Sequence, residues 1–228
     1  MRTLKHIILC LITLCTFLSK SQAQTITNND VVRSSLDEMF EELNKSKVPT
    51  GYLLDYAMDL VEFERYNGME LTDSNFVTPP IFEEILLSIK SASVGPSPYN
   101  DVSRIMTDFT TSTISNNINI AYVGYKYNFI KENALENNLI SYSVGKVSDV
   151  YLNGIWQNPY DEAYIFGFTP SISVCKVGTV NFKFSETYAF YNISRSSLKF
   201  DAGDGAGYRG LSPTHTITVN YTTPGKKE

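Results

Sequence analysis

Two aspartates near the C-terminus, Asp201 and Asp204, are the residues whose type and spacing best fit a metal site. They lie three apart on a glycine-bearing turn, where two carboxylates and nearby backbone carbonyls can hold calcium. The alternative is an ordinary turn in which the aspartate side chains accept backbone N–H bonds. Because the distal glutamate of an EF-hand is absent, the turn is the favoured interpretation, and calcium here is the one cofactor considered.

The same segment is rich in glycine, with Gly203, Gly205, Gly207 and Gly210 closely spaced. A nucleotide-binding loop would follow a strand, open a helix and carry a Lys-Ser/Thr pair, and none of these accompanies the run. We therefore interpret these glycines as turn positions with positive φ.

Three aromatic residues, Trp156, Tyr160 and Tyr164, fall in a stretch punctuated by turn residues. A flat, exposed aromatic surface is one on which a sugar ring can stack, so the three are candidate ligand-binding residues. The alternative is that they fill the seam between the helices and the sheet. Burial is the commoner role of large aromatic side chains, and it is the favoured interpretation.

The N-terminus has the pattern of a secretory signal peptide. Arg2 and Lys5 precede an apolar run over Ile7–Leu18, and Ser21–Ala23 supplies small residues for cleavage after Ala23. This run is shorter than the roughly 20 residues that span a bilayer, so we expect no membrane span in the mature chain. The sequence thus predicts a secreted or cell-surface protein.

Removal of the signal peptide changes the charge and the cysteine content. Sixteen basic residues then face twenty-four acidic ones, a net charge of about −8, which disfavours nucleic-acid binding. Cys175 is the only cysteine that remains, so no intrachain disulfide can form.

Catalytic residues are not evident. His215 is the only histidine of the mature chain, and no Gly-x-Ser-x-Gly motif accompanies it, which disfavours a catalytic triad. Cys175 lies in a predicted strand over Ile172–Cys175 and is interpreted as a small buried hydrophobic residue. Carboxylate pairs such as Glu41–Glu42 and Glu83–Glu84 leave glycoside hydrolysis open, but their place on the polar faces of predicted helices favours solvated charge.

The elements that must position these residues change in type along the chain. Apolar residues recur at helical spacing over Ser34–Phe63, which predicts two helices, with a capping box at Ser35 and Glu38 and a second helix around Leu53–Leu60. A third helix is predicted from Pro79.

Beyond Pro98 the apolar residues alternate with a period of two, as in half-buried strands. The predicted strands cover 118–129, 139–144, 147–152, 172–175, 180–184, 198–200 and 217–221. The expected fold is α+β: an N-terminal segment of two to three helices, followed by an antiparallel β-sandwich.

Three separated motifs near the C-terminus resemble those of polycystic kidney disease (PKD) type immunoglobulin-like domains. They are Gly178–Phe182 (GTVNF), Phe200–Gly205 (FDAGDG) and Val219–Gly225 (VNYTTPG), in the order of that family. Phe200 replaces the tryptophan of the family, and Ala202 replaces an aromatic residue. The resemblance implies a sandwich module over residues 170–228 whose last strand would follow Glu228.

The upstream region resembles the N-terminal part of large exported proteins of Bacteroidetes-type bacteria. The residues that carry this likeness are Leu36–Phe40, Val48–Gly51 and Leu54–Ala57. It implies location and modularity, and no activity.

The expected organisation is a signal peptide over 1–23, a helical region over 24–115, a β-rich region over 116–169 and the PKD/Ig-like module over 170–228. We expect a non-catalytic structural or interaction scaffold segment of an exported protein, with downstream domains of a longer chain as its partners. The alternatives are an adhesion module that binds carbohydrate or protein, and the accessory region of an exported hydrolase. If the last strand is lacking, Ile217, Val219 and Tyr221 form an open edge that favours association.

Overall fold

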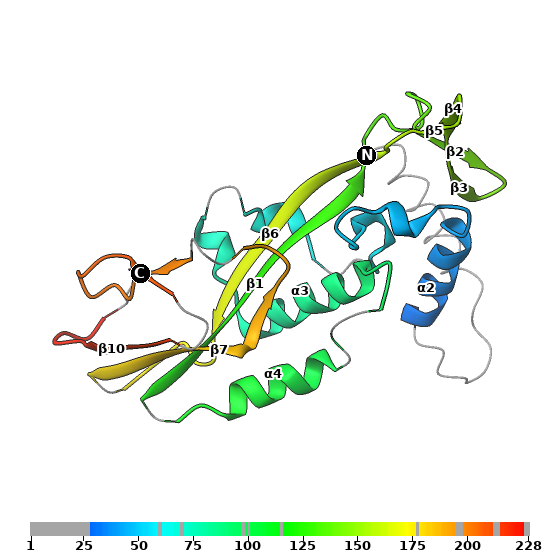
Figure 1. Ribbon diagram of the computed structural model, residues 1–228. Helices are drawn as coiled ribbons and strands as arrows, with labels where there is room; N and C mark the ends of the chain where they lie inside the picture. Colours follow the sequence, from blue (N-terminus) through cyan, green and yellow to red (C-terminus); the bar gives the residue numbers. More distant parts are fainter. Residues whose placement is uncertain are drawn as a thin grey trace, which may run out of the picture. The chain divides into compact units, whose positions relative to one another are not determined.

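The computed structural model describes residues 28–58, 61–68, 71–96, 99, 101–114, 116–176, 178–194, 198–211 and 215–225 (Figure 1). The predicted signal peptide lies outside these residues. The chain is α+β, with helices first and strands from Asn117 onward. It forms two compact units, and each draws on segments that are distant in sequence. Unit 1 comprises Met1–Met58, Ser91–Ser97 and Tyr127–Glu162, and unit 2 comprises Asp59–Lys90, Pro98–Lys126 and Ala163–Glu228.

In the described part of the chain, the helical elements precede the strands. They are α2 (Asn28–Met39), η1 (Lys45–Lys47), η2 (Leu54–Tyr56), η3 (Phe63–Tyr66), η4 (Asp73–Asn75), α3 (Pro79–Ala92) and α4 (Val102–Thr111), where η marks a 3-10 turn. Within the described residues, no helix is long and apolar enough to cross a membrane.

The first predicted helix is present, but its predicted capping box is wrong. Helix α2 begins at Asn28, so Ser35 lies inside it, where its Oγ donates to the backbone oxygen of Val31 at 3.0 Å. The third predicted helix is confirmed, because α3 begins at Pro79.

The second predicted helix does not form, although the residues predicted to be buried on it are buried. Leu53 and Tyr56 are buried as the pattern predicts, yet only the short turn η2 forms there. Tertiary hydrogen bonds replace a helix: Leu53 N donates to Ala92 O at 2.9 Å, and the Asp55 carboxylate accepts from Ile130 N at 2.7 Å.

Helix α4 was not predicted. The Asp101 side chain caps it by accepting from Arg104 N at 3.0 Å, and Val102, Met106 and Phe109 form its buried face. An N-cap followed by apolar residues at this spacing is the pattern that could have revealed it.

Ten strands follow the helices among the described residues. They are β1 (Asn117–Ile130), β2 (Ile140–Ser143), β3 (Lys146–Asp149), β4 (Tyr151–Leu152), β5 (Ile155–Trp156), β6 (Tyr160–Pro170), β7 (Thr179–Tyr191), β8 (Lys199–Phe200), β9 (Arg209–Gly210) and β10 (Thr216–Asn220). The strand predicted over Ile172–Cys175 is wrong: Pro170 ends β6, and the segment after it is irregular.

The main sheet has the strand order β10-β7-β1-β6, and β10 is one of its edges. Strand β7 pairs with β10 in antiparallel fashion but with β1 in parallel fashion, so the prediction of a purely antiparallel arrangement is wrong for this pair. The reason is the connection: after β6 the chain crosses to the other side of β1. The remaining described strands form two-stranded ribbons, so the β-sandwich stays a prediction.

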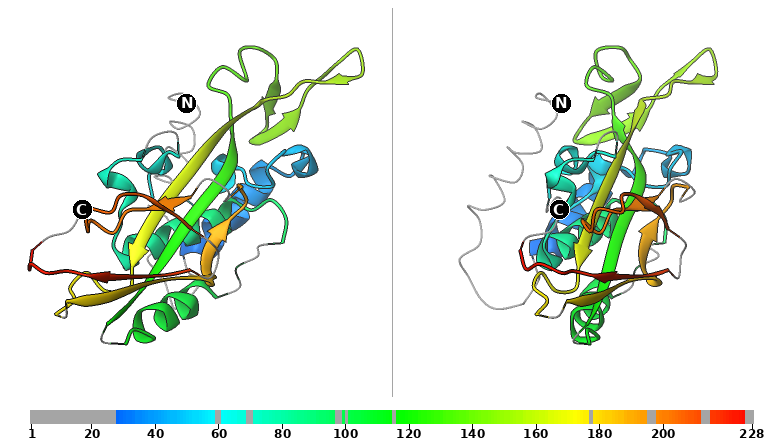
Figure 2. Two further views of the ribbon diagram at one scale, coloured as in Figure 1. Left: turned by 60° about the vertical axis from the view of Figure 1, so that its left-hand side comes forward. Right: turned by 90° about the vertical axis from the view of Figure 1, so that its left-hand side faces the viewer.

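Two ribbons of unit 1 are hairpins with two-residue turns of the same kind. Ribbon β2–β3 turns at Val144 (φ 51°) and Gly145 (φ 82°), and β4–β5 turns at Asn153 (φ 52°) and Gly154 (φ 78°). Asn-Gly is the preferred pair for such a turn, whereas a β-branched residue at positive φ is strained. Figures 1 and 2 show both hairpins beyond the ends of β1 and β6.

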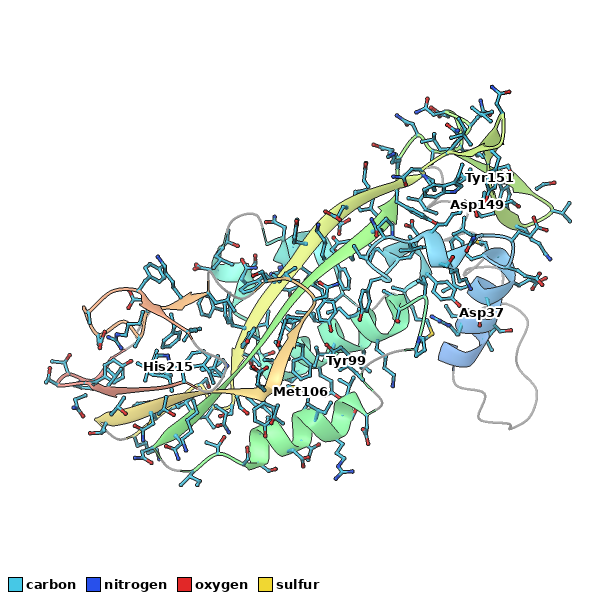
Figure 3. The ribbon with its side chains drawn as sticks, in the orientation of Figure 1. Asp37, Tyr99, Met106, Asp149, Tyr151 and His215 are labelled. Carbon is cyan, nitrogen blue, oxygen red and sulfur yellow. The ribbon has the colours of Figure 1, made fainter. Side chains whose placement is uncertain are left out.

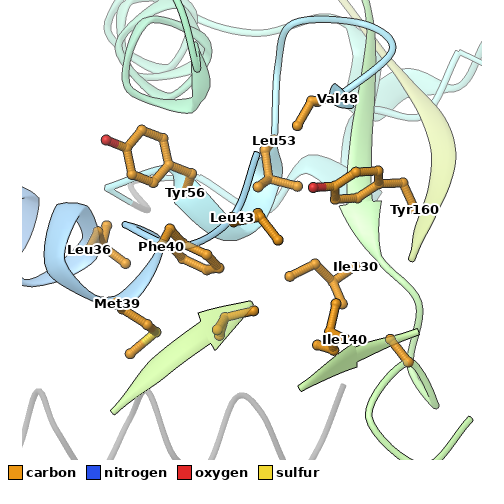
Figure 4. Packing of buried hydrophobic residues seen from close by; sticks show 12 residues of the cluster. Leu36, Met39, Phe40, Leu43, Val48, Leu53, Tyr56, Ile130, Ile140 and Tyr160 are labelled. Atoms are coloured by element: carbon orange, nitrogen blue, oxygen red, sulfur yellow. The ribbon is translucent and has the colours of Figure 1, made fainter. Parts of the chain in front are cut away.

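The core of unit 1 joins these elements (Figure 4). Phe40 at the end of α2 is fully buried, and its ring meets that of Tyr56 edge-on at 5.9 Å. The buried members of this core come from helix, turns and strands: Leu36, Met39, Phe40, Leu43, Val48, Leu53, Tyr56, Ile130, Ala134, Ile140, Val147 and Tyr160.

One buried amide connects the irregular N-terminal segment of unit 1 to its strands. Asn128 on β1 is 2% exposed. Its Oδ1 accepts from Thr50 N at 2.9 Å and Thr50 Oγ1 at 2.8 Å, and its Nδ2 donates to Asp161 O at 3.0 Å. The buried side chain thereby pairs backbone groups of two distant segments at a partly buried site.

We predict that Asn128→Ala lowers the free energy of unfolding by about 2–4 kcal/mol, because Thr50 N and Asp161 O lose their partner and the buried Asn128 side chain leaves a gap. Urea denaturation measures the change. Asn192→Ala is the control, since Asn192 makes a similar pair of bonds with Lys126 N and O at an exposed site and should cost less. Equal losses would contradict the role given to burial.

We predict that Val144→Asn raises the free energy of unfolding by about 1 kcal/mol, since Val144 is 97% exposed and loses no packing while the positive φ is relieved. The reciprocal change Asn153→Val should lower stability by a similar amount. Denaturation midpoints with unchanged slopes measure both effects. A destabilised Val144→Asn variant would refute the strain argument.

Candidate functional site

The three aromatic residues predicted as a ligand-binding surface are divided between the two units. Trp156 and Tyr160 lie in unit 1, with ring centroids 6.2 Å apart. Tyr164 belongs to unit 2, where Lys126 Nζ lies 5.5 Å from the centroid of its ring. Tyr160 is 4% exposed and part of the core, which agrees with the alternative of aromatic residues that fill the interior.

Tyr160 carries a buried hydroxyl that has no hydrogen-bond partner among the described residues. Burial raises the pKa of this phenol, and the negative charges of Asp149 and Asp55 raise it further. Tyr160 therefore stays neutral at physiological pH and supports Trp156 from the core side.

A different set of residues surrounds Trp156. In the β4–β5 hairpin, which we call the contact hairpin (151–156), Tyr151 is paired across the strands with Trp156. Lys47 on η1 reaches both rings: its Nζ lies 4.5 Å from the centroid of Tyr151 and 4.7 Å from that of Trp156. The same ammonium donates to Tyr151 Oη at 2.7 Å. Lys47, Tyr151 and Trp156 form the aromatic–lysine cluster.

Asp149 fixes the orientation of the indole. Its Oδ1 accepts from Trp156 Nε1 at 2.7 Å, and its Oδ2 accepts from Asn44 N at 2.8 Å. Asn44 also caps η1, since its Oδ1 accepts from Ser46 N at 3.2 Å. One carboxylate thus connects the indole to the turn that carries Lys47 (Asp149 and Tyr151 are labelled in Figure 3).

The two faces of the contact hairpin differ in chemistry. Adjacent residues of a strand point to opposite faces, so Leu152 and its cross-strand partner Ile155 lie on the face opposite Tyr151 and Trp156. Leu152 is 52% exposed and Ile155 is 69% exposed, while Tyr151 is 51% exposed. The hairpin therefore presents an aliphatic face and an aromatic, cationic face.

Sequence reasoning missed Lys47, Asp149 and Tyr151. The Asn153–Gly154 turn predicts a two-residue hairpin, and that register by itself pairs Tyr151 with Trp156. No local pattern could place Lys47 there, because it is about a hundred residues away in the chain.

The predicted aspartate pair forms a hydrogen-bonded turn. Asp201 Oδ1 accepts from Gly203 N at 2.9 Å, and Asp204 Oδ1 accepts from Ala206 N at 3.1 Å. Arg209 also binds both carboxylate oxygens of Asp204, and this hydrogen bond is the main cause that lowers the pKa of Asp204. These bonds give both carboxylates a role within the β8–β9 turn, in line with the turn interpretation.

Three of the four glycines in this turn, Gly203, Gly205 and Gly207, have positive φ as predicted, while Gly210 lies in β9. Among the described residues, no three His, Cys, Asp or Glu side chains are grouped so as to hold a metal ion. Cys175 packs against the core of the β7–β10 region as predicted, but it is half-buried rather than buried and lies outside a strand.

No protein-family model matches this chain, and neither a curated protein nor a solved structure matches it. The resemblance to PKD-type domains therefore stays a prediction. The function must be argued from the site itself.

We predict that Asp149→Ala shifts the fluorescence of the chain's single tryptophan to longer wavelength and lowers the free energy of unfolding by about 1–3 kcal/mol, because Trp156 Nε1 and Asn44 N lose their acceptor. Asp149→Asn keeps an acceptor oxygen and should show a smaller change in both measurements. Identical spectra for Asp149→Ala and the parent chain would show that the carboxylate does not hold the indole.

Proposed function

We propose that this chain is a non-catalytic interaction segment of a secreted or cell-surface protein, and that the contact hairpin is part of its contact surface. The observation that carries this proposal is the exposure of large apolar side chains on the hairpins of unit 1. Ile155, Leu152 and Val144 are 69%, 52% and 97% exposed.

Such exposure is costly in water, and neighbouring exposed apolar side chains, as Leu152 and Ile155 are across the two strands, are typical of contact sites. The neighbouring turns add to this argument. Val144 is both exposed and held at positive φ, where asparagine would be less strained. Val144 contributes neither packing nor turn stability within the chain, so we attribute its presence to a contact with another molecule.

The export of the chain is the second element of the proposal. It rests on the signal-peptide pattern over residues 1–23, with cleavage after Ala23. Intact-mass analysis of the exported chain, expected to begin at Gln24, tests this element separately from the contact surface.

The third element is a PKD/Ig-like module at the C-terminal end of the chain. Its support is the packing of the β8–β9 ribbon on the main sheet: the Phe200 ring lies 5.1 Å from that of Phe182 and 5.2 Å from that of Phe184. Ala202 is buried in the same core, beside Val219 of β10. Two layers around shared apolar residues are what a sandwich requires.

We predict that the double variant Leu152→Ser/Ile155→Ser binds several-fold more weakly than the parent to washed envelopes of the producing cells, because its aliphatic contact face is lost. The measurement is a sedimentation assay with fluorescently labelled chain. Leu135→Ser is the matched control, since Leu135 is 46% exposed in unit 1 but lies outside the hairpins. The proposal fails if the parent chain does not bind envelopes, or if the double variant binds as well as the control.

A further inference from the structure

We infer that the aromatic–lysine cluster is a saccharide-binding site, in which a pyranose ring stacks on Tyr151 beside Trp156 while Lys47 donates hydrogen bonds to the sugar. This inference rests on the proposed role of the contact hairpin as a contact surface and names the ligand of its aromatic face. Tyr160 and Tyr164, which the sequence offered as candidates for this role, lie in the core of unit 1 and in unit 2, respectively.

Part of the surface of Tyr151 is open to solvent and can therefore contact a ligand. Tyr151 is 51% exposed although Lys47 Nζ lies over its ring, so about half of the surface of this residue is open to solvent. Tyr151 and Trp156 stand directly opposite each other on one face of the hairpin. Two aromatic side chains on one face, with Lys47 Nζ near both rings, offer apolar surface with polar groups at its edge, which suits the C–H face and the hydroxyls of a sugar.

Lys47 has donor capacity left for a ligand. Its ammonium carries three N–H donors, and within the described part of the chain only Tyr151 Oη accepts from it. No carboxylate of the described residues lies within 4.0 Å of Lys47 Nζ, whereas Lys45 pairs with Asp37 and Lys146 pairs with Glu41. The ammonium of Lys47 can therefore donate hydrogen bonds to acceptor atoms of a ligand.

Unit 1 contains a second cation–aromatic contact, at Tyr56, which serves a purely structural role and can be compared with the aromatic–lysine cluster. Lys45 Nζ lies 4.2 Å from the centroid of the Tyr56 ring, and Arg33 lies over the same ring at 3.9 Å. Tyr56 is 3% exposed, and Lys45 is paired with Asp37. The cluster at Tyr151 has the same contacts but remains exposed and lacks the ion pair.

The site is held in place before any ligand arrives. Asp149 binds the Trp156 indole and the backbone of Asn44, and Asn44 caps the turn that carries Lys47. A rigid arrangement loses less conformational entropy on binding than flexible side chains do. Weak stacking and a few hydrogen bonds can then suffice for recognition.

The polar groups of this face favour a sugar over an apolar peptide. An ammonium with unused donors, a phenol hydroxyl and a carboxylate surround the rings, whereas the opposite face carries only Leu152 and Ile155. A pyranose presents hydroxyls around its edge, and those hydroxyls can satisfy these groups. The two faces therefore suit ligands of different chemistry.

Binding at this site can be followed by intrinsic fluorescence, because Trp156 is the only tryptophan of the chain. The experiment is a titration of the full chain with soluble polysaccharides, followed by tryptophan fluorescence and by acrylamide quenching. The probes are laminarin and mannan as neutral saccharides, and polygalacturonate and chondroitin sulfate as acidic ones. At least one of them should shift the emission and protect Trp156 from acrylamide in a saturable manner.

Variants then assign the effect to residues. Tyr151→Ala should weaken binding about tenfold, and Tyr151→Phe, which keeps the ring, should weaken it less. Lys47→Met should weaken it as well, with the larger loss and a strong salt dependence if an acidic polysaccharide is the ligand. Leu152→Ser/Ile155→Ser should bind saccharide like the parent chain.

The outcomes separate this inference from the proposed function. If no saccharide protects Trp156 while the chain still binds envelopes through Leu152 and Ile155, the saccharide site is refuted and the contact surface stands. If saccharide binds equally well to Tyr151→Ala, the site lies elsewhere and the inference is wrong. If neither saccharides nor envelopes bind, both proposals are wrong.

Discussion

The buried amide of Asn128 is the constraint on which the arrangement of unit 1 depends. Among the described residues between α2 and α3, the only helical elements are short 3-10 turns, so backbone groups there must find partners outside regular structure. Asn128 supplies them for Thr50 and reaches Asp161 on the adjacent strand. In this way the segment that carries Lys47 is attached to the strands. Asn75 plays the corresponding role in unit 2, where it is fully buried and donates to Phe166 O at 2.7 Å.

The contact hairpin shows how strand geometry alone creates two different surfaces. With two residues in each strand and a two-residue turn, alternation assigns every side chain to a face. The aromatic face is then completed from a distant segment by Lys47 and from β3 by Asp149. The aliphatic face receives no such partners among the described residues, because Leu152 and Ile155 remain exposed.

The periodicity of apolar residues predicted which side chains are buried better than it predicted the backbone conformation. Leu53 and Tyr56 recur at helical spacing and are buried, yet the hydrogen bond from Leu53 N to Ala92 O takes the place of a helical one. The α+β class, helix α3 and strand β1 follow from long, consistent patterns, which local preferences determine. The parallel pairing of β7 with β1 could not be predicted, since it depends on which edge of the sheet β7 joins, and local sequence does not specify that edge.

The sequence by itself determined the local chemistry of this protein: the turn at Asp201 and Asp204, the Asn153–Gly154 hairpin and the alternation that buries β1. These features depend on residues within a few positions of one another. Only the tertiary structure decided which aromatic residue joins Trp156 at an exposed face and which cation covers them. Contacts over about a hundred residues arise from the packing of a shared core, and no local pattern in the chain encodes that packing.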